Sequence, residues 1–158
     1  MYQRILVPID GSTTSAFGLD EAIKLAKLTG ASLRLIHVVD ALTITTGLVP
    51  SAYYADEVPP RAKEAGVQIL EQARIRVEAS GVKVDTFLFD SMVARVSETV
   101  IEQAKAWNAD LIVIGTHGRR GVGRILLGSD AEQIVRTAPV PVLLVRAPEV
   151  EGKADTKV

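Results

Sequence analysis

The sequence contains no cysteine among its 158 residues. This absence excludes a disulfide framework, thiol catalysis, an iron–sulfur cluster and any cysteine-ligated zinc site. The chain also has no excess of positive charge, because its 18 basic residues are balanced by 19 acidic ones. There is therefore no overall positive field to attract nucleic acid or an anionic membrane. The longest charge-free stretch, residues 41–55, is rich in Thr and Ser and falls short of the roughly 18 apolar residues that a membrane helix needs. We therefore predict a cytoplasmic protein without a nucleic-acid or membrane partner.

An ordinary globular composition remains once those classes are excluded. Hydrophobic residues make up 47% of the chain and charged residues 23%, which is typical of folded domains. A chain of 158 residues can bury a core without help from a metal or a disulfide. We predict a single domain over residues 1–147 and a flexible tail over residues 148–158.

Short apolar segments alternate with longer amphipathic ones along the chain. The apolar segments, each of strand length, are Ile5–Ile9, Leu33–Val39, Val84–Phe89, Leu111–Ile114 and Val140–Val145. Between them, apolar residues recur every three or four positions near Ala16–Ala26, Pro60–Ser80, Val93–Trp107 and Ser129–Ala138. Because the strands are apolar throughout, both faces of the sheet should be covered. The pattern predicts an α/β fold with an open parallel sheet and helices on both faces.

A glycine-rich segment, residues 115–129 (GTHGRRGVGRILLGS), follows the fourth apolar run and opens the last helix. Its glycines allow backbone N–H groups to approach a ligand, and the helix adds the positive end of its dipole. Three arginines add positive charge: Arg119, Arg120 and Arg124. These features suit a polyphosphate. The alternative is a basic surface loop that leads into a helix capped by Ser129, since Ser129 and Glu132 fit a capping box.

Asp10 is the second candidate, because it ends the first apolar run. In open parallel sheets, ligands bind beyond the carboxyl ends of the strands, where the strand order reverses. A carboxylate there can accept hydrogen bonds from ribose hydroxyls or an adenine amine. If the first and fourth strands are neighbours, Asp10 and Gly115 meet at one crevice and form a nucleotide site. The alternative is that Asp10 only shapes the turn before Gly11.

Together these segments resemble the universal stress protein family. The resemblance is carried by ILVPIDGS (5–12), LIHV (35–38), DLIVIG (110–115) and the glycine-rich segment. ATP-binding members of that family carry Gly, two residues, Gly, nine residues, then Gly and Ser or Thr. Here Gly115 and Gly118 are followed, after nine residues, by Gly128-Ser129. The resemblance covers nearly the whole chain, from residue 2 to about residue 146.

The resemblance implies a five-stranded sheet in the order 3-2-1-4-5, the arrangement shared with adenine nucleotide alpha hydrolase-like proteins. It also implies binding of ATP, or of AMP or ADP, without an established catalytic residue. By likeness, the residues that would contact the nucleotide are Pro8 and Asp10 beside the adenosine, Val38 on adenine through its backbone, Ile114 and Gly115 under the ribose and first phosphate, and Gly118, Gly128 and Ser129 at the phosphates.

Asp130 departs from the family pattern, which usually has an apolar residue there. Its carboxylate repels a triphosphate unless it turns away or shares a divalent cation, so Mg²⁺ is a possible companion of the nucleotide. The family usually has a glycine after the third strand, where this chain has Asp90-Ser91, and we interpret Ser91 as the N-cap of the third helix. We interpret His37 as a core histidine and His117 as a solvated loop residue. The protein itself is expected to hold no metal and no catalytic residue.

The last apolar run predicts self-association. Val140–Val145 is apolar on both faces and should lie at the edge of the sheet, where an exposed apolar strand tends to pair. The resemblance likewise implies a homodimer through this strand. The alternative is that the C-terminal tail covers it.

The predicted function is that of a nucleotide-dependent regulator in stress adaptation, whose state is read by a downstream protein. We expect nucleotide binding to order residues 40–58 and 115–129 and so to alter the surface that this partner reads. Two alternatives stay open. One is a slow ATP hydrolase or phosphotransferase, for which Asp10 and Asp130 are the obvious acidic candidates. The other is a nucleotide-free dimeric scaffold.

Overall fold

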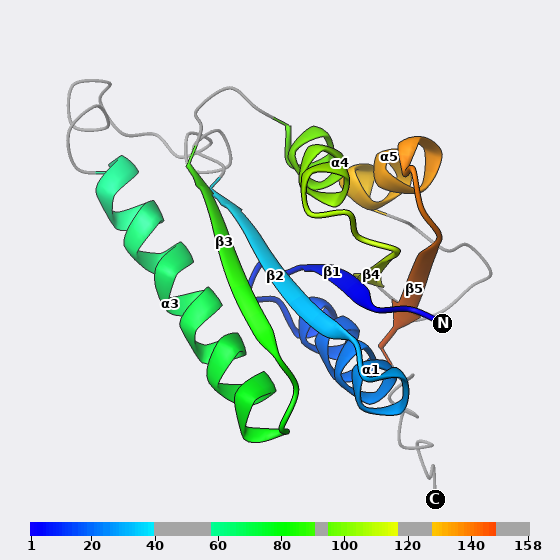
Figure 1. Cartoon of the computed structure of the whole chain (residues 1–158). Coiled ribbons are helices and arrows are strands. Elements are labelled where there is room, and N and C mark those ends of the chain that lie inside the picture. The colour runs from blue at the N-terminus through cyan, green and yellow to red at the C-terminus, as the bar shows by residue number, and fades with distance from the viewer. Residues whose placement is uncertain (40–57, 91–94, 117–127, 148–158) are drawn as a thin grey trace, which may run out of the picture.

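The computed structural model describes residues 1–39, 58–90, 95–116 and 128–147 (Figure 1). The described elements are, in chain order, β1 (Arg4–Pro8), α1 (Thr13–Thr29), β2 (Ser32–Val39), α3 (Val58–Ala79), β3 (Val84–Asp90), α4 (Val96–Ala106), β4 (Leu111–Thr116), α5 (Ser129–Thr137) and β5 (Val142–Arg146). The strands form one sheet in the order β3-β2-β1-β4-β5, and every pairing is parallel. The predicted fold class and strand order are confirmed.

The two neighbours of β1 are set by its register. Ile5 lies opposite Leu33 of β2 on one side and opposite Leu111 of β4 on the other. At the amino end of the sheet, the Asp110 carboxylate accepts hydrogen bonds from the N–H groups of Gln3 and Arg4, at 2.7 and 3.0 Å. This side chain therefore holds the start of β1 beside the start of β4, and the carboxyl ends of both strands lie together at the opposite edge.

Alternate strand residues enter opposite hydrophobic cores, as the period of a strand requires. Ile5 and Val7 face α1 and α3 in one core, whereas Leu6 faces α4 and α5 in the other. Figure 1 shows the two helix pairs on opposite sides of the twisted sheet. Because helices cover both faces of the sheet, the strand sequences are apolar at successive positions rather than at alternate ones.

The ends of several elements differ from the sequence prediction. β5 begins at Val142 rather than at Val140, because Pro141 has no N–H to give to the ladder and contributes only its carbonyl to Ile112. The helix α5 has Gly128, not Ser129, at its N-cap, so the predicted capping box is wrong. The helix α4 begins at Val96 with Arg95 at its N-cap, and the Arg95 side chain makes no capping hydrogen bond, so the interpretation of Ser91 as the N-cap of this helix is wrong.

The apolar spacing predicts buried faces that the structure shows shifted at one position in each helix. The predicted faces are Ala62, Ala65, Ile69, Ala73 and Val77 in α3, and Ala131, Ile134, Val135 and Ala138 in α5. In α3 the buried positions include Gly66, Leu70 and Val77, whereas Ala65 is exposed. In α5, Ile134 is buried but Val135 is 44% exposed. Both shifts arise because the sheet covers only part of each helix circumference, which the apolar spacing alone overestimates.

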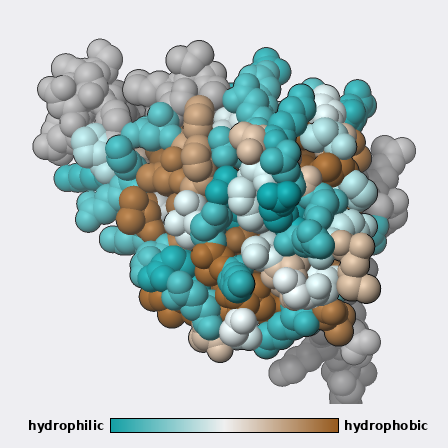
Figure 2. All heavy atoms as spheres, in the orientation of Figure 1, coloured by the Kyte–Doolittle hydropathy of each residue, from teal (hydrophilic) through white to brown (hydrophobic). Residues whose placement is uncertain are grey.

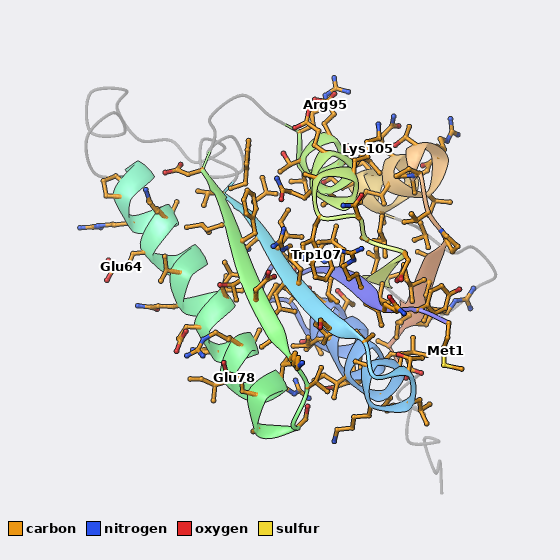
Figure 3. The ribbon with its side chains drawn as sticks, in the orientation of Figure 1. Met1, Glu64, Glu78, Arg95, Lys105 and Trp107 are labelled. Carbon is orange, nitrogen blue, oxygen red and sulfur yellow. The ribbon has the colours of Figure 1, made fainter. Side chains whose placement is uncertain are left out.

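Three aromatic residues lie on or against the sheet. The rings of Phe87 and Phe89 stack along β3 with centroids 6.4 Å apart. Trp107, at the end of α4, is half-buried and lies against the sheet (Figure 3), with the Arg34 guanidinium 4.8 Å from its ring centroid. Figure 2 shows hydrophobic residues reaching the surface among hydrophilic ones along β3 and α3.

The predictions for residues 40–57, the arginine-bearing part of the glycine-rich segment and the tail 148–158 fall outside the described residues. Among the residues that are described, no helix is long and apolar enough to cross a membrane.

Candidate functional site

A cavity of about 570 Å³ opens at the carboxyl edge of the sheet. Its walls come from the ends of β1, β2 and β4, the start of α1, one face of α3, and the first turns of α4 and α5. The strand order reverses here: from β1 the sheet extends through β2 and β3 on one side and through β4 and β5 on the other. The volume lies within the range of roughly 300–1,000 Å³ that small-molecule sites occupy.

Asp10 is positioned by the turn that leaves β1. Its Oδ1 atom accepts a hydrogen bond from the Ser12 N–H at 2.8 Å, and Gly11 turns the chain with a φ of 80°. Ser12 in turn caps α1 by accepting from the Ser15 N–H at 3.1 Å. Asp10 is thus a turn residue, as the alternative reading predicted, and it also borders the cavity.

The same contacts set the charge state of Asp10. Burial raises the pKa of this carboxyl group, but hydrogen bonding with Ser12, and to a smaller extent with Ser15, outweighs burial and holds the pKa below its usual value. Asp10 is therefore ionised at neutral pH. Only one of its oxygens is engaged by the Ser12 N–H, which leaves acceptor capacity for a ligand.

Gly115 lets α1 approach β4 closely. A Cβ atom on Gly115 would overlap the carbonyl oxygen of Thr14, and a Cβ on Gly18 would lie 2.7 Å from the Gly115 nitrogen. The absence of a side chain at residue 115 is therefore required by packing against α1. The sequence suggested a different reason for glycine at this position, the close approach of a ligand to the backbone.

Gly128 has a different environment. A Cβ there would meet no atom within 4 Å, and the residue borders the cavity. The first backbone bond of α5 runs from the Glu132 N–H to the Gly128 carbonyl, so the N–H groups of Ser129, Asp130 and Ala131 have no acceptor inside the helix. The turn thus borders the cavity with an open backbone and with N–H groups that have no backbone partner among the described residues.

Val38 directs its backbone polar groups toward the β1 side of β2. Residues 33, 35, 37 and 39 direct their N–H and C=O groups toward β3, as the bond from the Leu33 N–H to the Lys83 carbonyl shows. Even-numbered residues of β2 therefore face β1, as the bond from Ile9 N–H to the Ile36 carbonyl confirms. Val38 lies just beyond the end of β1, and its polar groups face the cavity edge.

The structure brings most of the predicted site residues to this one cavity. Those that line it are Pro8, Asp10, Val38, Ile114, Gly115, Gly128, Ser129 and Asp130. The others, Gly118, Arg119, Arg120 and Arg124, lie outside the described residues. In the described ranges, no group of three or more His, Asp or Glu residues is placed to hold a metal ion.

Several polar residues of the cavity wall were not predicted from the sequence, and Ser15 and His37 are two of them. Ser15 is buried, and its hydroxyl donates to the Ser12 carbonyl at 2.9 Å. His37 was interpreted as a core residue, yet it is half-buried and lines the cavity, with Nδ1 2.8 Å from the Ile9 carbonyl oxygen. Its place two residues from the end of an apolar strand was the available signal, since ligands bind beyond that end.

Comparisons with known proteins agree with this architecture. Residues 1–146 match the universal stress protein family. Universal stress protein MJ0531 from Methanocaldococcus jannaschii is 36% identical over 151 residues, covering 96% of this chain and 86% of the relative. A solved structure from the same family in Burkholderia pseudomallei is 33% identical with a TM-score of 0.71, covering 92% of this chain and 97% of its own.

A further solved structure is described as a universal stress protein in complex with cAMP. It shares 26% identity and a TM-score of 0.64 with this chain, covering 92% of this chain and 97% of its own. The family match over residues 1–146 and the strand order it accompanies lead to one conclusion. This chain belongs to the universal stress protein family.

Proposed function

We propose that the cavity binds an adenine nucleotide, ATP or a related one, and that the protein acts as a nucleotide-dependent regulator in the cytoplasm. The observation that carries the proposal is the meeting of an ionised carboxylate, Asp10, with the donor-rich first turn of α5 across one cavity. A ribose offers hydroxyl donors to the first, and phosphates offer acceptors to the second. The related protein in complex with cAMP supports the same ligand class.

The chemistry of the cavity wall fits each part of such a ligand. The N–H and C=O of Val38 form a donor–acceptor pair that matches N1 and the amino group of adenine. Ile114 and Pro8 supply apolar surface beside it. Gly128 leaves the space that a side chain would fill, so phosphates can lie directly on the backbone of α5.

The charge of Asp130 affects which form of the nucleotide binds. It lines the cavity in the first turn of α5, and within the described residues its carboxylate makes no hydrogen bond or ion pair. A free carboxylate there opposes a bare triphosphate. A nucleotide with fewer charges, or ATP together with Mg²⁺, meets less repulsion.

Calorimetric titration with ATP, with and without Mg²⁺, tests the proposal. We expect saturable binding that Asp10→Ala and Gly128→Val each weaken, because the first removes the ribose acceptor and the second fills the phosphate space. Glu132→Gln is the matched control on α5, since Glu132 pairs with Arg136 at 2.9 Å instead of lining the cavity. No binding up to about 1 mM, which corresponds to only about −4.1 kcal/mol, would refute the proposal.

We propose in addition that β5 carries a homodimer contact. It is an edge strand, and Leu144 at its centre is 39% exposed, while Val135 of α5 is 44% exposed nearby in the chain. An apolar edge strand is a favourable surface for pairing with another chain.

A further inference from the structure

His37 replaces a strand hydrogen bond at the mouth of the cavity. In the β1–β2 ladder, Pro8 lies opposite Ile36, and the Ile9 N–H donates to the Ile36 carbonyl at 2.9 Å. The next bond of a regular parallel ladder would run from the Val38 N–H to the Ile9 carbonyl. Instead, His37 Nδ1 lies 2.8 Å from that carbonyl oxygen.

The carbonyl can only accept, so His37 must carry its proton on Nδ1 to make this contact. Within the described residues, no backbone N–H donates to Ile9. The chain after Ile9 turns away from β2, with the Asp10 N–H directed toward the Ser15 hydroxyl at 3.5 Å. Among the described residues, the Ile9 carbonyl therefore accepts from His37 Nδ1 in place of the Val38 N–H, and Val38 borders the cavity.

The helix α3 holds the imidazole ring in place. A Cβ on Gly66 would lie 2.7 Å from Cδ2 and 3.1 Å from Nε2 of His37. Only a glycine lets α3 pass this close to the ring, and the ring is thereby confined between the helix and the Ile9 carbonyl. The donor on Nδ1 is consequently fixed in direction as well as in tautomer.

We propose that His37 is a positioning residue that keeps the Val38 backbone available to read the base. Its imidazole satisfies the Ile9 carbonyl, which prevents the β1–β2 ladder from closing by one more bond over the cavity. The freed N–H and C=O of Val38 accept adenine, whose N1 accepts and whose amino group donates. They reject hypoxanthine, whose N1–H donates and whose O6 accepts. This inference rests on the proposed adenine-nucleotide site.

Two substitutions separate the donor from the volume of the side chain. His37→Leu removes the Nδ1–H, so the Ile9 carbonyl must take the Val38 N–H or stay unpaired. His37→Asn keeps an amide donor near the position of Nδ1. Both variants are first checked by urea unfolding, so that binding is compared between folded proteins.

Ligand-free hydrogen exchange tests the proposal without any nucleotide. In the wild-type protein we expect the Val38 amide to exchange faster than the Ile36 amide, which lies inside the ladder. In His37→Leu we expect the Val38 amide to exchange at least about tenfold more slowly, because it gains the Ile9 acceptor. Equal protection of Val38 in the wild type and in His37→Leu would overturn the proposal.

Titration with AMP and IMP tests the consequence for recognition. We expect His37→Leu to weaken AMP at least about fivefold and to lose the preference for AMP over IMP, and His37→Asn to recover most of both. An equal loss for the two nucleotides, or no recovery in the Asn variant, would mean that His37 only supports the fold. If the wild-type protein binds neither nucleotide, the proposed function fails, and the exchange experiment still decides whether His37 frees Val38.

Discussion

Gly115 and Gly128 border the same cavity, but their surroundings make different demands. The space beside Gly115 is filled by the backbone of α1, whereas the space beside Gly128 is open. Packing therefore requires glycine at residue 115 but not at residue 128. Substitution of each glycine by alanine tests this difference.

We expect Gly115→Ala to lower the free energy of unfolding by about 3 kcal/mol or more, because a rigid backbone carbonyl on Thr14 cannot move aside easily. Gly128→Ala is the matched control, and we expect it to cost no more than about 1 kcal/mol, the scale of an N-cap substitution. Urea unfolding of both variants measures the difference. Similar values for the two would contradict this account of Gly115.

Asp10 makes a contribution to stability that depends on pH. Its hydrogen bonds with Ser12 and Ser15 hold the pKa of the folded carboxyl group below that of the unfolded chain. The contribution is therefore complete above the unfolded value of about 3.9 and is lost as the pH falls through the lower folded pKa. We expect the stability advantage of the wild type over Asp10→Asn to be constant from pH 7 to 5 and to shrink below about pH 4. Urea unfolding at several pH values measures it, and an advantage that grows on acidification would refute the assignment.

At the scale of an element, the first turn of α5 serves two purposes that conflict. Asp130 and Glu132 lie near the positive end of the helix dipole, which stabilises the helix. Only Asp130 lines the cavity, so its charge also acts on any ligand there. The element thus combines donors that attract phosphate with one carboxylate that opposes it.

We expect Asp130→Asn to bind Mg²⁺-free ATP about fivefold more tightly, or better, than the wild type, since one like-charge interaction of about 1 kcal/mol or more is removed. Adenosine, which carries no phosphate, should bind both proteins equally. Glu132→Gln changes the same charge on the same turn and should leave both affinities unchanged. Calorimetry with the two ligands decides, and a parallel effect in Glu132→Gln would point to the helix dipole instead.

For the whole molecule, the two edges of the sheet are unlike. β3 carries Asp85 and Asp90, which pair with Arg34 at 2.6 Å and with Lys63 at 3.2 Å. β5 places an exposed leucine at its centre. Charges protect an edge against pairing, and an apolar residue invites it. Association should therefore occur at β5.

We expect Leu144→Lys to weaken the dimer at least about tenfold, because a lysine would have to be buried at the contact. Leu28→Lys is the control, since Leu28 is 80% exposed on α1. Light scattering during size-exclusion chromatography gives the mass of each variant. A monomeric wild type, or a dimer that survives Leu144→Lys, would exclude a contact centred on Leu144.

The predictable part of this protein follows from local patterns. The continuous apolar runs determined which segments form buried parallel strands. Gly30 and Gly81, both with positive φ, follow the ends of α1 and α3, where glycine commonly ends a helix. The motif resemblance supplied the strand order and part of the cavity wall, including Asp10, Val38 and Gly128. Those properties depend on residue type and on spacing along the chain, which the sequence contains in full.

The tertiary structure decided what depends on distance between segments. Three features depend on how separate elements meet: glycine is required at residue 115 by the Thr14 carbonyl, α5 begins at Ser129 with Gly128 as its N-cap, and His37 contacts the carbonyl of Ile9. A local pattern gives a residue's face within its element, but not the atoms that another element places opposite. The cavity exists because β1 turns away after Ile9 while β2 continues to Val39, and only the assembled sheet shows that difference.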